Sequence, residues 1–92
     1  MVGRLENKVC YITGAASGIG LACAERLSAE SATIIGSDLT ISDEWSKRVA
    51  GEESFYELDV RDEQAQIEVV SNIVDTYGRI DAVITSAGVA GG

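Results

Sequence analysis

Short apolar runs alternate with helix-periodic segments along almost the whole of this chain, and that alternation limits the folds open to it. The first run, at 8–13, is nearly continuous in apolar residues, those at 33–37 and 82–85 are similar, and 54–58 is the fourth candidate. Short runs without polar alternation are typical of strands buried on both faces, as in parallel sheets. A chain of 92 residues has room for one domain at most. We therefore expect a single α/β domain over residues 1–92, built on a parallel sheet.

The segments between these runs have helical periodicity, at 18–30, 42–49 and 62–77. The first carries Ile19, Ala22, Cys23 and Leu27, and the second is weaker, with Trp45 and Val49 four residues apart. The last segment is the clearest, because its apolar residues recur at helical spacing, with two more widening the stripe. These are Ile67, Val70, Val74 and Tyr77, widened by Val69 and Ile73. Gly78 follows, where a left-handed helix cap favours glycine. Right-handed crossovers then predict a doubly wound, Rossmann-type parallel sheet with strand order 3-2-1-4.

Glycines are concentrated in the turn from the first strand into the first helix. Gly14 permits a tight turn, Gly18 permits close approach of a ligand, and Gly20 permits close packing of the helix on the strand. A helix N-terminus attracts phosphate through its N–H groups and partial positive charge, and the Ser17 hydroxyl adds a donor. The spacing is neither G-x-G-x-x-G nor a P-loop, because Ile19 follows Gly18 where a P-loop has lysine. A glycine-rich turn without a ligand is the alternative.

Acidic residues follow the second and third strands. Asp38 comes eighteen residues after Gly20, where a carboxylate accepts hydrogen bonds from ribose hydroxyls and repels a 2′-phosphate. This favours NAD over NADP, unless Asp38 only caps a helix or forms a turn. Asp59 could accept from the adenine amino group, with the backbone of Val60 completing the contact, or could be a turn residue. After the fourth strand, Ala87 and Gly88 are small enough to let a cofactor pass, or belong to a simple loop.

The composition argues against several other functions. The net charge of −8 opposes binding to nucleic acid and to anionic membranes, which need basic patches. The sequence contains no histidine, and its two cysteines have no metal-ligand spacing, so we expect no metal site. Cys10 and Cys23 are expected to be buried, reduced thiols of a cytoplasmic protein. No apolar run approaches the length of a membrane-spanning helix.

The residues resemble those of the short-chain dehydrogenase/reductase family. The matching stretches are "KVCYITGAASGIG", "SD" at 37–38, "LDVRDE" at 58–63 and "YGRIDAVITSAGVA" at 77–90. The resemblance implies a nicotinamide cofactor and the N-terminal, cofactor-binding half of such an enzyme. It implies that Gly14, Ser17, Gly18 and Ile19 lie along the pyrophosphate and ribose, and that Asp38 and Leu39 meet the adenosine ribose and adenine. It also implies that Asp59 and Val60 meet the adenine, and that Ser86, Ala87 and Gly88 lie near the central riboses.

The chain departs from the family pattern at several positions. Ser86 follows Thr85 where the family often has two asparagines, and Ser31 stands where glycine often follows the first helix. A left-handed conformation at Ser31 would cost roughly 1 kcal/mol. The family's catalysis resembles a Ser-Tyr-Lys constellation, with tyrosine and lysine four residues apart. No tyrosine of this chain has a lysine four residues later, so we expect no catalytic residue in it.

These observations predict the NAD-binding portion of an oxidoreductase that interconverts a secondary alcohol and a ketone by hydride transfer. The isolated chain is expected to be inactive. A non-catalytic dinucleotide-binding or regulatory module is the main alternative, and a methyltransferase using S-adenosylmethionine is a weaker one, because the glycine spacing disfavours it. The fourth strand would leave an open sheet edge, so the partners expected are the missing C-terminal half or further copies of the chain.

Overall fold

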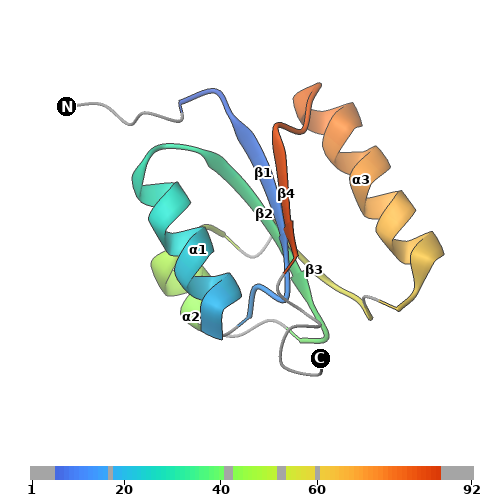
Figure 1. Cartoon of the computed structure of the whole chain (residues 1–92), viewed down its shortest axis with the longest axis horizontal. Coiled ribbons are helices and arrows are strands. Elements are labelled where there is room, and N and C mark those ends of the chain that lie inside the picture. The colour runs from blue at the N-terminus through green and yellow to red at the C-terminus, as the bar shows by residue number, and fades with distance from the viewer. Residues whose placement is uncertain (1–5, 17, 41–42, 52–53, 60, 86–92) are drawn as a thin grey trace.

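The structure is a four-stranded parallel sheet covered by helices on both faces (Figure 1). The computed structural model describes residues 6–16, 18–40, 43–51, 54–59 and 61–85. The elements follow one another as β1 (Val9–Thr13), α1 (Gly18–Ala29), β2 (Thr33–Asp38), α2 (Asp43–Arg48), β3 (Phe55–Glu57), α3 (Glu63–Tyr77) and β4 (Ala82–Thr85). The spatial order is β3-β2-β1-β4, which confirms the predicted topology.

Alternate residues of β1 point into two separate hydrophobic cores. Cys10 and Ile12 pack on the side of α1 and α2, whereas Val9 and Tyr11 pack on the side of α3. Figure 1 shows the same arrangement, with α1 and α2 on one face of the sheet and α3 on the other. All five residues of β1 are buried. This burial explains why the sequence of β1 is a continuous apolar run rather than an alternating one.

The orientation of α3 differs from the expected one. Val69 and Ile73 are its buried residues and contact the sheet, so the residues that only widened the predicted stripe form the actual contact. The main line of the stripe is exposed: Ile67 (60%), Val70 (37%), Val74 (43%) and Tyr77 (43%). The helix is turned so that Gln66 reaches the hydroxyl of Tyr11. Periodicity locates a wide apolar arc but not which edge of the arc meets the sheet.

The same kind of difference occurs in α1. Gly20, Leu21 and Ala24 are its buried residues, whereas Ile19 is 68% exposed. Of the residues in the predicted stripe, Cys23 and Leu27 are partly buried against the core. The face of α1 that meets the core therefore combines two small residues, Gly20 and Ala24, with the larger Leu21.

The C-terminal end of α3 agrees with its sequence signal at Gly78, and the structure adds a cap at the N-terminal end. Asp62 caps α3, its side chain accepting a hydrogen bond from Ala65 N, and Gly78 ends it with a φ of 82°. Ser31 has a φ of 70° after α1. Its N–H donates to Ser28 O at 2.9 Å and Ala32 N–H donates to Leu27 O at 3.2 Å, which is a Schellman motif. Ser31 thus adopts the left-handed conformation that was considered for it from the sequence. This conformation costs roughly 1 kcal/mol.

Trp45 joins α2 to the end of the sheet. Its side chain is fully buried, and its ring packs against Phe55 in an edge-on arrangement with centroids 5.1 Å apart. The indole N–H donates to Ser54 Oγ at 3.0 Å, so its polar atom is satisfied inside the core. The ring lies over Gly36 of β2 and close to Ala15, so it supports the turn that follows β1.

Within the described residues, no helix is long and apolar enough to cross a membrane.

Candidate functional site

The glycine-rich turn between β1 and α1 is bonded to the end of β2. Gly14 has a φ of 70° and Gly18 a φ of 62°, which explains a glycine at each position. Ala15 N–H donates to Ser37 O at 3.0 Å, and Ala16 N–H donates to Asp38 Oδ2 at 3.1 Å. The turn is therefore held in one position relative to β2 before any ligand arrives.

The N-terminus of α1 has the features that an anion needs. Gly18 is exposed, and a Cβ built on it meets nothing within 4 Å, so the space beside its backbone is open. The first turn of α1 carries no acidic side chain that would compete for its partial positive charge. Gly20 is buried on the inner side of the helix, in agreement with a packing role.

Asp38 ends β2 directly beside this turn. Its Oδ1 accepts from Leu39 N–H at 2.7 Å, and its Oδ2 accepts from Ala16 N–H at 3.1 Å. A carboxylate has about four lone-pair positions, so two hydrogen bonds leave room for two more donors. The side chain is half-buried, and the neighbouring Leu39 is 65% exposed. Asp38 thus presents remaining acceptor capacity at the carboxyl end of the sheet.

Asp59 is held by Arg61, two residues further on. The backbone and side chain of Arg61 donate to both carboxylate oxygens at 2.7–3.2 Å. These hydrogen bonds lower the pKa of Asp59 from 3.8 to about 2. Asp59 O also accepts from Asp62 N–H at 2.9 Å, so Asp59 is a turn residue. The contact of Asp59 with adenine stays a prediction. The ion pair between Asp59 and Arg61 was not predicted from the sequence, although a D-x-R spacing suits an ion pair of this kind.

The carboxyl ends of three strands meet at one edge of the sheet. Thr13 of β1 lies between Ser37 of β2 and Thr85 of β4 in the register. The chain leaves β1 toward β2 and later returns to β4 on the opposite side, which makes this edge a topological switch point (Figure 1). Ligands of open α/β sheets bind in the crevice at such a point. Five predicted site residues lie outside the described residues: Ser17, Val60, Ser86, Ala87 and Gly88.

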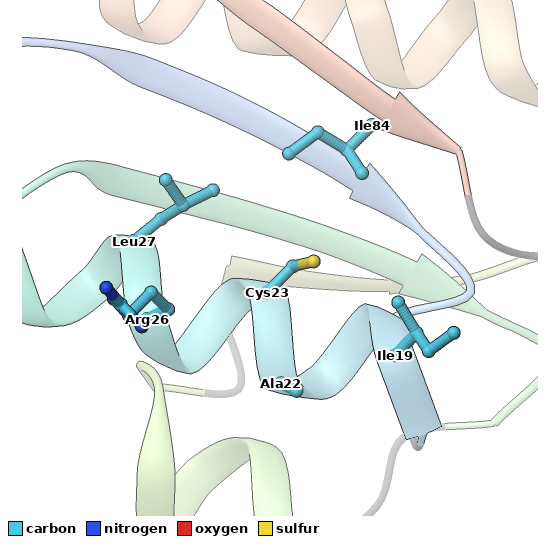
Figure 2. Close-up of a pocket in the computed structure, with 6 residues that line it drawn as sticks. All are labelled: Ile19, Ala22, Cys23, Arg26, Leu27 and Ile84. Atoms are coloured by element: carbon cyan, nitrogen blue, oxygen red, sulfur yellow. The ribbon is translucent and has the colours of Figure 1, made fainter.

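An apolar groove of about 340 Å³ lies between α1 and β4, and Figure 2 shows its lining. The lining residues are Ile19, Ala22, Cys23, Arg26, Leu27 and Ile84. Apart from Arg26 these side chains are apolar, so the groove is unsuited to phosphates or ribose hydroxyls. Only Ile19 belongs both to the groove and to the first turn of α1. The predicted polar site and the groove are therefore different regions that touch at one residue.

The cysteines do not form a reactive or metal-binding site among the described residues. Cys10 is buried, and burial raises the pKa of its thiol, so it stays protonated. Cys23 is partly buried and also free, in partial agreement with the expectation that both are buried. Within the described part of the chain, no group of three or more Cys, Asp or Glu side chains is arranged to hold a metal ion.

Comparison with known proteins matches this arrangement to one family. The model of the short chain dehydrogenase family matches residues 8–92. The 3-oxoacyl-(acyl-carrier-protein) reductase FabG of Thermotoga maritima is 41% identical over 91 residues, covering 94% of this chain and 37% of the relative. Two solved structures have a TM-score of 0.72: an NAD+-bound xylitol dehydrogenase and a carveol dehydrogenase from Mycobacterium avium in complex with NAD.

The xylitol dehydrogenase is 33% identical and aligns with 87% of this chain and 33% of its own length. The carveol dehydrogenase is 28% identical and aligns with 89% of this chain and 36% of its own length. The chain thus spans about a third of the length of the relatives that it matches. With the sheet order, the glycine-rich turn and the family match in agreement, the chain belongs to the short-chain dehydrogenase family.

Proposed function

We propose that this chain is the NAD-binding portion of an oxidoreductase that interconverts a secondary alcohol and a ketone. The observation that carries the proposal is the position of Asp38, whose carboxylate is hydrogen-bonded to the glycine-rich turn at the switch point of the sheet. The bound dinucleotide would accept or donate the hydride. The residues of this chain would bind and orient that dinucleotide, and the proton-transferring residues would lie outside these 92 residues.

The diphosphate would lie over the N-terminus of α1. The open space at Gly18 lets a phosphate approach the backbone, and the helix dipole favours its negative charge. The net charge of −8 makes such a local positive field necessary, because the protein as a whole repels an anion. Gly14 and Ser17 would complete the turn around the diphosphate, with Ile19 beside the ribose.

The adenosine would lie across the ends of β2 and β3. Asp38 would accept hydrogen bonds from the two ribose hydroxyls, and the exposed Leu39 would offer an apolar contact to the adenine. Asp59 would accept from the adenine amino group, with Val60 beside it. A 2′-phosphate would face the charge of Asp38, which supports NAD as the preferred cofactor. The NAD-bound state of the related xylitol and carveol dehydrogenases also supports this choice.

The central riboses would pass the end of β4, where Ser86, Ala87 and Gly88 follow Thr85. The described residues of β4 are mostly exposed, and β4 is an outer strand of the sheet. We propose that the remaining part of the longer protein, or another copy of the chain, covers this edge.

The location proposed for the protein is the cytoplasm.

Titration of this chain with NAD and with NADP in a calorimeter tests the proposed function. We expect NAD to bind more tightly than NADP by about tenfold, since a 2′-phosphate close to Asp38 costs roughly 1.4 kcal/mol or more. A tighter affinity for NADP would contradict the role of Asp38. Absence of binding by either dinucleotide would contradict the proposal that this chain holds the cofactor.

The chain alone should not oxidise alcohols. We expect no alcohol-dependent formation of NADH by purified chain, because none of its tyrosines has a lysine four residues later. The control is the same preparation passed through a second purification step that removes contaminating dehydrogenases. Turnover that persists at constant specific activity would show that the chain contains its own proton-transferring residue.

A further inference from the structure

A chain of hydrogen bonds joins β1, β2 and α3 beneath the proposed adenosine site. Tyr11 OH lies 2.9 Å from Ser37 Oγ and donates to Gln66 Oε1 at 2.7 Å. The three residues are far apart in the sequence: Ser37 comes 26 positions after Tyr11, and Gln66 comes 55 positions after it. One hydroxyl therefore connects three separate elements of the fold.

The Tyr11 hydroxyl is well suited to hold these elements in fixed positions. Tyr11 is 1% exposed and Ser37 is fully buried, so water does not replace either of these two residues in the bond between them, whereas Gln66 is half-buried. Burial raises the pKa of Tyr11, which keeps its proton on the phenol oxygen. Because that proton is donated to Gln66, the phenol oxygen accepts from the Ser37 hydroxyl. Among the described residues, every buried side-chain polar atom has a hydrogen-bond partner. For the buried hydroxyl of Ser37, that partner is Tyr11.

Both ends of this hydrogen-bond chain lead to a residue proposed to bind adenosine. On one side, Ser37 directly precedes Asp38, and its carbonyl accepts from Ala15 N–H at 3.0 Å. On the other side, Gln66 N–H donates to the carbonyl of Asp62 at 3.1 Å, and Asp62 N–H donates to that of Asp59 at 2.9 Å.

The apolar packing between α3 and the sheet does not fix this geometry by itself. Val69 and Ile73 contact Val9, Tyr11 and Ile35 through side chains without polar atoms other than the phenol. Such contacts are non-directional, so they do not specify where the polar groups at the start of α3 lie. Hydrogen bonds have preferred distances and angles, and two from one oxygen fix the start of α3 relative to the end of β2.

We propose that Tyr11 is a positioning residue of the adenosine half of the site, and that its hydroxyl sets the separation of Asp38 and Asp59. Tyr11 itself does not touch the cofactor. This inference rests on the proposed function, because that proposal assigns the two carboxylates to adenosine. It adds a residue that acts on both of them from inside the core.

The variant Tyr11→Phe removes only the phenol oxygen, and amide NMR of the ligand-free chain gives the first measurement. Ala16 and Leu39 donate their N–H groups to Asp38, and Arg61 donates its N–H to Asp59, so these amides report on the two carboxylates. We expect all three amide signals to shift in Tyr11→Phe. Unchanged signals would overturn the proposal, whether or not the chain binds a nucleotide.

Binding of two probes gives the second measurement. ADP-ribose reaches the carboxylates, and we expect its affinity to fall about fivefold in Tyr11→Phe, as for a disturbed hydrogen bond to a charged group. Inorganic pyrophosphate reaches only the turn, and its affinity should fall less than that of ADP-ribose. An unchanged affinity for ADP-ribose would contradict the positioning role. If the unaltered chain does not bind ADP-ribose, the proposed function fails, and the amide shifts still decide whether Tyr11 sets the carboxylates.

Two control variants separate positioning from general loosening of the fold. Tyr77→Phe makes the same chemical change at a residue that is 43% exposed, and it should leave the amides and both affinities unchanged. Val69→Ala weakens the apolar contact of α3 without touching the polar chain. It should lower stability without the coordinated shift of the three amides. The same shifts in Val69→Ala would show that any loosening of α3 is sufficient, which would overturn the specific role of Tyr11.

Discussion

Replacement of Gly36 by alanine should destabilise this chain by about 3 kcal/mol, as expected for the stronger cases of overpacking in a core. A Cβ at Gly36 would lie 2.6 Å and 2.7 Å from Cη2 and Cζ3 of Trp45, and 2.9 Å from Cβ of Ala15. The indole cannot easily move away, because it is fully buried and its N–H is bonded to Ser54. Movement of Ala15 would instead displace the glycine-rich turn.

Urea unfolding followed by far-UV circular dichroism measures this effect, with a lower midpoint and an unchanged slope expected. The matched control is Gly78→Ala, because Gly78 has a φ of 82° but nothing within 4 Å of its added Cβ. Backbone strain alone should cost this control about 1 kcal/mol. Gly36→Ala combined with Trp45→Leu should be no less stable than Trp45→Leu alone. Equal stability of Gly36→Ala and Gly78→Ala would refute the close contact with Trp45.

Replacement of Asp38 by alanine should change cofactor choice more than any other single substitution in the proposed site. The ribose hydroxyls would lose their charged acceptor, which is worth about 1.5–3 kcal/mol, or roughly a ten- to hundredfold weaker affinity for NAD. The affinity for NADP should change less, because repulsion of its 2′-phosphate disappears at the same time. The ratio of the two affinities should therefore fall by about tenfold.

Calorimetric titration of Asp38→Ala and two further variants separates the causes. Asp38→Asn keeps an oxygen that can accept from Ala16 N–H but removes the charge, so it should retain the turn and lose the discrimination. Asp75→Ala removes the same charge from an exposed position of α3 and should alter neither affinity. A ratio that stays the same in Asp38→Ala would exclude this carboxylate as the residue that selects NAD.

The sequence was sufficient to predict the topology, because each element carries its own local signal. The continuous apolar run of β1 and the glycine after α3 each depend on neighbouring residues only. The position of Asp38 at the end of β2 follows from the same local pattern. Its hydrogen bond to Ala16 does not, because the two residues are 22 positions apart and only the folded sheet brings them together.

The rotation of α3 about its own axis could not be predicted from the local sequence. Its apolar residues cover a wide arc, and two buried residues, Val69 and Ile73, lie at one edge of it. With this edge facing the sheet, the polar Gln66 reaches Tyr11 across 55 positions of sequence. A polar side chain on the inner face of a helix gives no periodic signal, so this contact could be found only in three dimensions.

We expect the dinucleotide to bind at the glycine-rich turn and the end of β2, and not in the apolar groove beside α1. Amide NMR of the isotopically labelled chain, titrated with NAD, tests this most directly. We expect the largest shifts at Gly14, Gly18, Asp38 and Leu39, with small changes at Arg26 and Leu27 of the groove. Shifts centred on Arg26 and Leu27, with Asp38 and Leu39 unaffected, would contradict the account.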